Sequence, residues 1–112
     1  MSEQEIGIAN AAGGIVVTPE GDIDMHRSPE LRSALRGVND QRPPRLVVNL
    51  AKVGYMDSSG LATLVECMRT AKGHKTEMIL CGMNDRVRAI FDIARLDQFF
   101  IIVPTVDDIV GS

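Results

Sequence analysis

The stretch Met56-Asp57-Ser58-Ser59-Gly60-Leu61 decides the fold of this chain, because a predicted strand ends before it and a predicted helix begins within it. Upstream, Arg45-Leu46-Val47-Val48-Asn49-Leu50 is an apolar, β-branched run of strand length. Downstream, apolar residues recur at helical spacing: Leu61, Leu64, Val65 and Met68. Gly73 is placed to end that helix. Ser58 is therefore expected at a helix N-terminus, close to free backbone N–H groups and the positive end of the helix dipole.

The remaining elements follow from the same periodicities. Strands are predicted over 6–9, 15–18, 45–51, 78–81 and 99–103. Helices are predicted from the Ser28 N-cap with Pro29 at the first helical position, over 59–72, from Asn84-Asp85, and as a short turn from Thr105 to Asp108. The residues expected on the buried helix faces are Leu31, Leu35 and Val38, then Val87, Ile90, Phe91 and Ala94.

This order predicts an α/β domain with a mixed β-sheet. Residues 6–18 read as an antiparallel hairpin, and from residue 45 onward strands and helices alternate. Right-handed crossovers make the later strands parallel and pack the helices on the sheet. With 112 residues, 45% of them hydrophobic, we expect a single domain over 1–112.

Composition excludes several classes of protein. No apolar run is long enough to span a bilayer, and the acidic N-terminus is opposite to a secretory signal, so we expect a cytoplasmic protein without membrane contact. A net charge of −3 argues against nucleic-acid binding. Cys67 and Cys81 are expected to be buried free thiols, and with the scattered His26 and His74 they do not form a metal site. No cofactor is expected.

Local physics leaves two roles open for the Ser58 hydroxyl. Ser and Asp are the preferred N-cap residues, so capping alone is one role. A phosphoryl acceptor is the other, because helix N-terminal amides tolerate an anion. A serine hydrolase is not supported, since Ser58 has no Gly-x-Ser-x-Gly elbow and no histidine where a base is expected. A receiver domain is not supported either, since the first strand is followed by Gly13-Gly14 and the last by Pro104 without a lysine.

The ordered motifs resemble those of the STAS (sulphate transporter and anti-sigma factor antagonist) family. Asp57-Ser58-Ser59-Gly60-Leu61 is similar to the phosphorylation motif of its small anti-sigma factor antagonists. Gly21-Asp22-Ile23-Asp24, Leu46-Val47-Val48-Asn49-Leu50 and Arg88-Ala89-Ile90-Phe91-Asp92 resemble further family segments in the expected order. The resemblance covers residues 14 to about 103.

The resemblance implies a phosphorylation-controlled protein switch without catalytic activity. The unphosphorylated form binds an anti-sigma factor that has serine kinase activity, which frees a sigma factor. That kinase uses its own ATP and magnesium to modify Ser58, the serine directly after the Asp, and a separate serine phosphatase reverses the reaction. The alternative is an accessory subunit of a transport or lipid-trafficking complex. The retained acceptor serine favours the switch.

Two groups of residues are expected to surround the acceptor. Asp57, Ser59 and Gly60 adjoin it in sequence, and Asp22 and Asp24 follow a strand that ends at the same edge of the sheet. Asp24 is equally well read as a plain turn or cap residue. Large side chains flank the turn, and we expect an exposed ridge that contacts the partner: Tyr55, Met56 and Leu61, with Met25 as a weaker candidate.

Overall fold

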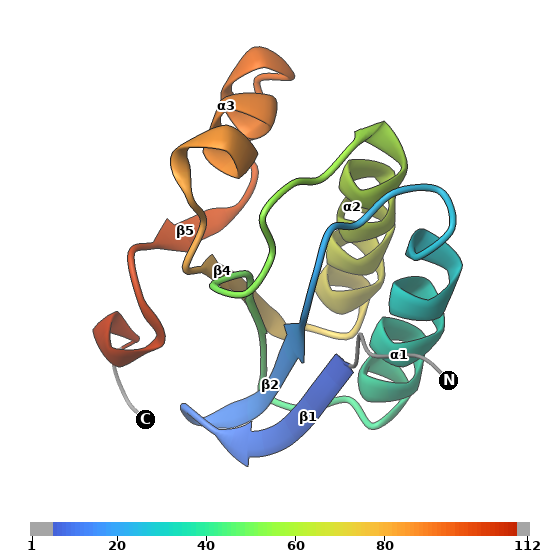
Figure 1. The fold of residues 1–112 in the computed structure, drawn as a ribbon. Coiled ribbons are helices and arrows are strands. Elements are labelled where there is room, and N and C mark those ends of the chain that lie inside the picture. Colours follow the sequence, from blue (N-terminus) through green and yellow to red (C-terminus); the bar gives the residue numbers. More distant parts are fainter. Residues whose placement is uncertain (1–5, 110–112) are drawn as a thin grey trace.

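The structure is a computed structural model that describes residues 6–109, and within them the chain forms one α/β unit (Figure 1). The elements, in chain order, are β1 (Ile6–Ala11), β2 (Gly14–Pro19), α1 (Ser28–Asp40), β3 (Arg45–Asn49), α2 (Ser58–Gly73), β4 (Glu77–Cys81), α3 (Asp85–Ile93), β5 (Ile101–Val103) and the 3-10 helix η1 (Val106–Asp108). The predicted succession of strands and helices is confirmed.

The sheet has five strands in the order β1-β2-β3-β4-β5. β1 and β2 pair antiparallel, and every later pair is parallel. The mixed sheet predicted from the sequence is therefore confirmed. Because β2, β3 and β4 run in parallel, their carboxyl ends meet at one edge, and the segments that follow them lie together there.

The two faces of the sheet carry cores of different size. The larger core lies between the sheet and the helices, where alternate strand residues meet the predicted apolar stripe of α1. Its members include Val17, Val48, Leu80, Leu31, Leu35, Val38, Leu64, Val87 and Phe91. On the other face a smaller core joins Val16, Val47 and Ile79 to Ile109, which follows η1. In Figure 1, α1 and α2 lie side by side against the sheet, whereas α3 stands apart beside β5.

Several details differ from the sequence prediction. Ser28 is not an N-cap: it is the first residue of α1, it is buried, and its backbone N–H donates to the Asp24 carbonyl at 2.8 Å. β5 begins at Ile101 rather than residue 99, because Phe100 turns inward against Phe91, with ring centroids 5.5 Å apart. Ala94 is exposed, because α3 has already ended at Ile93.

Other expectations agree with the structure. Asp108 accepts a hydrogen bond from the Thr105 N–H at 3.0 Å, as a capping box requires. Cys67 and Cys81 are both free and buried. Burial raises the pKa of the Cys67 thiol to about 11, so this thiol is protonated at neutral pH. Among the helices of residues 6–109, none has the length and apolar character needed to cross a membrane.

Candidate functional site

The loop between β3 and α2, residues 50–57, is fixed by backbone contacts on the β4 side. The Leu50 N–H donates to the Cys81 carbonyl at 2.8 Å, which extends the pairing of β3 with β4. The Asn49 side chain turns back and accepts from the Ala51 N–H at 3.1 Å. Gly82 is required here: its φ is +78°, and a Cβ would lie 2.8 Å from the Ala51 nitrogen.

The segment after β2 fixes the loop on its other side. Ile23 pairs with Met56 as an isolated parallel bridge: the Ile23 N–H donates to the Tyr55 carbonyl at 2.9 Å, and the Asp57 N–H donates to the Ile23 carbonyl at 3.1 Å. This bridge could not be predicted from the sequence, because a single pair of residues has no periodicity. It nevertheless sets the position of Asp57, the residue directly before α2.

Asn84 anchors the loop from a third direction. Its carboxamide oxygen caps α3 by accepting from the Val87 N–H at 2.8 Å. Its Nδ2 donates to the carbonyls of Val53 at 3.3 Å and Gly54 at 3.1 Å. The sequence predicted that α3 starts at Asn84. The contacts of Asn84 with the loop could not be predicted, because they depend on the loop passing the start of α3. The loop before α2 is thus held at both ends and in the middle.

Asp57 is the N-cap of α2. Its Oδ1 accepts from the Ser59 N–H at 2.8 Å, the Ser59 hydroxyl at 2.6 Å and the Gly60 N–H at 3.3 Å. The hydrogen bond from the Ser59 hydroxyl is the main reason why the pKa of Asp57 lies below its ordinary value, and the two backbone donors add to this effect. Of the two cap candidates in the sequence, Asp57 therefore does the capping, and it does so as a carboxylate.

The two neighbouring serines have different environments. Ser58, the first residue of α2, is exposed, and no hydrogen bond of its hydroxyl is found among residues 6–109. Ser59 is half-buried, its hydroxyl donates to Asp57, and its carbonyl accepts from the Thr63 hydroxyl at 2.9 Å. Ser58 therefore offers its oxygen to an incoming group, whereas Ser59 would have to give up its hydrogen bond to Asp57 first.

Gly60 lets the start of α2 sit directly on the core. A Cβ at this position would lie 2.6 Å from Met56 Cγ and 2.9 Å from Ile23 Cγ2. Both distances are shorter than a Cβ tolerates, so even alanine would push the first turn of the helix outward. The glycine of the Asp-Ser-Ser-Gly motif therefore has a packing role that fixes where Ser58 lies.

Met56 is a correction to the predicted contact ridge. Its exposed fraction is 0%, so it belongs to the core and offers no surface to a partner. The reason is the strand-like alternation of residues 55–57: Met56, paired with Ile23, points inward, and Tyr55 points outward. Tyr55 is 39% exposed and carries the Arg86 guanidinium 5.6 Å from its ring centre. Met25 is 70% exposed.

The acidic residues near the turn act separately. Asp24 closes a turn: its Oδ1 accepts from the N–H groups of His26 at 2.9 Å and Arg27 at 3.2 Å. Asp22 is exposed and lies beside Gly54, whose Cβ would be 3.2 Å from Asp22 Oδ1. In residues 6–109 no three His, Cys, Asp or Glu side chains are grouped closely enough to hold a metal ion.

An open groove begins at Ser58 and follows the outer side of α2. Its volume is about 510 Å³, and its walls include Leu61 and Val65 of α2 and Leu96 from the segment after α3. Leu61 is half-buried, so the predicted contact residue is only partly available at the surface. The groove places an apolar surface directly beside the exposed Ser58 hydroxyl.

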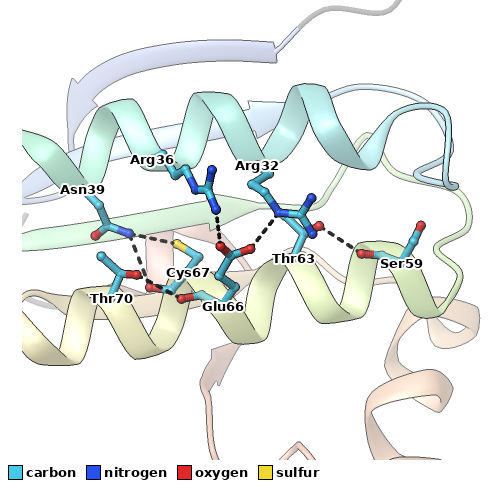
Figure 2. A network of polar contacts seen from close by, with 8 residues as sticks. All are labelled: Arg32, Arg36, Asn39, Ser59, Thr63, Glu66, Cys67 and Thr70. Carbon is cyan, nitrogen blue, oxygen red and sulfur yellow. Dashed lines mark hydrogen bonds and ion pairs between the residues drawn. The ribbon is translucent and has the colours of Figure 1, made fainter.

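The side of α2 that faces α1 is closed by a polar network (Figure 2), whose central residue, Glu66, also lines the groove. Glu66 accepts from Arg32 at 2.7 Å and from Arg36 at 2.6 Å. Deeper in the seam, the buried Asn39 donates to the Cys67 carbonyl at 3.3 Å. Arg32 and Arg36 of α1 thus join the two helices through Glu66 of α2.

Comparisons with known proteins agree with this architecture. The model of the STAS domain family matches residues 7–109. The anti-sigma-B factor antagonist of Listeria monocytogenes is 31% identical over 78 residues, which cover 70% of this chain and 68% of that protein. The anti-sigma-B factor antagonist of Staphylococcus aureus is 32% identical over 76 residues, 68% of this chain and 70% of that protein. The chain therefore belongs to the STAS domain family.

Solved structures show the same fold. An anti-sigma factor antagonist from Mycobacterium paratuberculosis superposes with a TM-score of 0.88 at 27% identity, covering 96% of this chain and 92% of that one. SpoIIAA in its unphosphorylated form gives a TM-score of 0.73 at 20% identity, over 89% of this chain and 87% of that one. The fold class predicted from the sequence is thus also that of these structures.

Proposed function

We propose that this protein is an anti-sigma factor antagonist whose binding is switched by phosphorylation of Ser58. The observation that carries the proposal is the exposed Ser58 hydroxyl at the start of α2, which has no hydrogen-bond partner among residues 6–109 and lies next to a carboxylate that already caps the helix. The names of the Listeria and Staphylococcus relatives and of the Mycobacterium structure support the antagonist role. SpoIIAA, a more distant protein of the same fold, has been solved in a phosphorylated form.

The partners follow from this role. The unphosphorylated protein binds an anti-sigma factor with serine kinase activity and frees a sigma factor. The kinase brings its own ATP and magnesium, and a serine phosphatase restores the hydroxyl. The protein itself is a cytoplasmic binding module rather than an enzyme.

The geometry supports Ser58 as the acceptor and a fold that tolerates its modification. The Ser58 oxygen is at the surface, whereas the Ser59 hydroxyl is engaged by Asp57 at 2.6 Å. A phosphate adds about −1.5 to −2 charges, and at a helix N-terminus this charge is favoured by roughly 0.3–1 kcal/mol. We therefore expect the fold to stay the same on phosphorylation.

The same charge opposes partner binding. A partner surface shaped for a neutral hydroxyl would have to bury a dianion beside the Asp57 carboxylate, at a cost of several kcal/mol. We assign the contact surface to Tyr55, Met25 and Leu61, which lie near the acceptor or line the groove that begins at Ser58. Met56 acts from below, by supporting the first turn of α2 through its contact with Gly60.

The experiment measures affinity for the cognate kinase with wild type, Ser58→Ala and Ser58→Asp. Ser58→Ala should bind like wild type and never be released by ATP, and Ser58→Asp should bind at least tenfold more weakly, equivalent to about 1.4 kcal/mol. Circular dichroism and the melting temperature should be nearly the same for all three, since the site is exposed. Equal affinities would remove the switch and support the accessory-subunit alternative.

Ser59→Ala is the matched control, and phosphopeptide mapping locates the modification. The Ser59 variant should still be phosphorylated at Ser58, with a small loss of stability because the hydrogen bond from the Ser59 hydroxyl to Asp57 is lost. Phosphorylation of Ser58→Ala at Ser59 with the wild-type rate would show that the acceptor has been assigned to the wrong serine.

A further inference from the structure

The two edges of the sheet are unequal. β5 has three residues and is followed by Pro104, which has no N–H to offer to a further strand. β1 has six residues, Ile6-Gly7-Ile8-Ala9-Asn10-Ala11, with neither a charge nor a proline among them. Residues 7–11 are all exposed, and within residues 6–109 only β2 pairs with β1. Natural proteins usually protect such an edge with lysine, proline or a bulge, because it readily pairs with another strand.

The turn between β1 and β2 determines which backbone groups point outward. Two residues with positive φ, Ala12 at 55° and Gly13 at 81°, connect Ala11 to its partner Gly14. In a two-residue hairpin the residues that flank the turn exchange both backbone hydrogen bonds, and such pairs then alternate along the strands. Every second residue counted back from Asn10 therefore directs its N–H and C=O groups away from β2. These residues are Asn10, Ile8 and Ile6.

The pairing of Ile6 agrees with this assignment. Its partner in β2 is Pro19, which has no N–H and therefore fits a pair that exchanges no hydrogen bonds. The free edge of β1 thus presents three N–H donors and three C=O acceptors in regular alternation, centred on Ile8. Ile8 itself is 53% exposed, on the face of the sheet that its partner Val17 shares with the helices.

We infer that β1 pairs antiparallel with β1 of a second copy of this chain, which joins the two sheets into one. With Ile8 opposite Ile8 of the second copy, Ile6 lies opposite Asn10, and every outward donor meets an acceptor. The two Ile8 side chains then cover each other on the same face of the joined sheet.

The occupant is a second copy because the edge is complementary to itself. In a contact with two-fold symmetry each residue near the axis meets its own counterpart, so a charge there would meet a like charge. β1 carries no charge, and its outward groups follow a pattern that a two-fold axis at Ile8 reproduces. The interface leaves Ser58 free in both copies, because β1 is an edge strand separated by β2 and β3 from the start of α2 (Figure 1).

The test is the oligomeric state of the full chain by multi-angle light scattering from about 1 μM to about 1 mM, the range in which a weak self-association is measured. Wild type should rise toward twice the mass of one chain. Ile8→Lys should stay at the mass of one chain throughout, because the two lysines would face each other at the axis. Ile93→Lys is the matched control: Ile93 is 83% exposed on α3, and its variant should associate like wild type.

Circular dichroism of Ile8→Lys checks that the variant is folded, and amide hydrogen exchange of wild type locates the interface directly. The amides of Ile6, Ile8 and Asn10 should exchange more slowly as concentration rises. A wild type that remains monomeric over the whole range would overturn the inference. So would a dimer that Ile8→Lys leaves intact, or concentration-independent exchange of these three amides.

Discussion

The two sides of α2 differ in how they are occupied. Toward α1 the helix is joined by the Glu66 ion pairs and by the hydrogen bond of Asn39 (Figure 2). Away from α1 it borders an open groove of about 510 Å³ that starts at Ser58, is lined by Leu61 and Val65, and reaches the edge of the α1 contact at Glu66. The same helix is therefore fixed along one side and accessible along the other.

This difference explains how a small domain can carry a modifiable residue without risk to its fold. The position of Ser58 is set by contacts below and behind it, through Met56, Gly60 and the α1 seam. Its hydroxyl and the groove face solvent. Changes on the fixed side should therefore alter stability first, and changes on the open side should alter binding first.

The largest effect is expected from Met56→Ala, beneath the start of α2. Met56 is fully buried and contacts the helix at Gly60, so truncation removes core volume. We expect a loss of about 2–5 kcal/mol in the free energy of unfolding, measured by urea denaturation. Tyr55→Ala is the matched control, because Tyr55 is 39% exposed, and it should cost about 1 kcal/mol or less.

The effects of these two variants on kinase affinity should be the reverse of their effects on stability. Tyr55→Ala should weaken affinity for the kinase while the protein remains stable. Met56→Ala should weaken binding only as far as its folded fraction falls. If Met56→Ala proved as stable as wild type, the first turn of α2 would not depend on the core below it.

A smaller effect is expected from Asn39→Ala on the fixed side. The change removes the hydrogen bond to the Cys67 carbonyl, but it also removes Asn39 Oδ1, a buried oxygen without a hydrogen-bond partner within residues 6–109. The two contributions oppose each other, so we expect a net loss of about 1 kcal/mol in thermal or urea unfolding. Affinity for the kinase should not change.

Ala62→Glu is the counterpart on the open side. Ala62 is exposed and lines the groove, so stability should stay within about 0.5 kcal/mol of wild type. The added negative charge near Ser58 should weaken kinase binding, as phosphorylation does. Ala89→Glu, at an exposed position of α3, is the control and should bind normally. Equal binding by both variants would show that the groove takes no part in the contact.

The elements and their order could be predicted from sequence because each rests on a local pattern. The apolar run at 46–48 and the stripe of Leu31, Leu35 and Val38 have the periods of a buried strand and a half-buried helix, and the structure buries all of them. The hairpin and the parallel strands followed from the same patterns combined with the handedness of crossovers.

The candidate site was predicted only in part, because its details depend on contacts between distant segments. The position of Ser58 at the start of α2 was correct. The burial of Met56 depends on its bridge with Ile23, and the fixing of the loop depends on Asn84, which is 30 residues from the Gly54 carbonyl that it binds. An apolar residue in a turn has the same sequence signature whether it faces the core or the solvent.

The smallest effect is expected from Glu66→Gln, and it appears as a change in pH dependence. The hydrogen bonds from Arg36 and then Arg32 hold the pKa of Glu66 below its ordinary value. The unfolded chain therefore binds a proton more readily than the folded one, so Glu66 stabilises the fold above about pH 4 and loses this contribution as pH falls through its folded pKa. The melting temperature of wild type should exceed that of Glu66→Gln at pH 7, and the difference should narrow toward about pH 3.

Because Glu66 is 39% exposed, water and added salt weaken the effect. In the Arg32→Gln/Arg36→Gln background the same substitution should change nothing, because the cations that lower the pKa are gone. A pH-independent difference, or one that persists in that background, would mean that the ion pairs do not join α1 to α2.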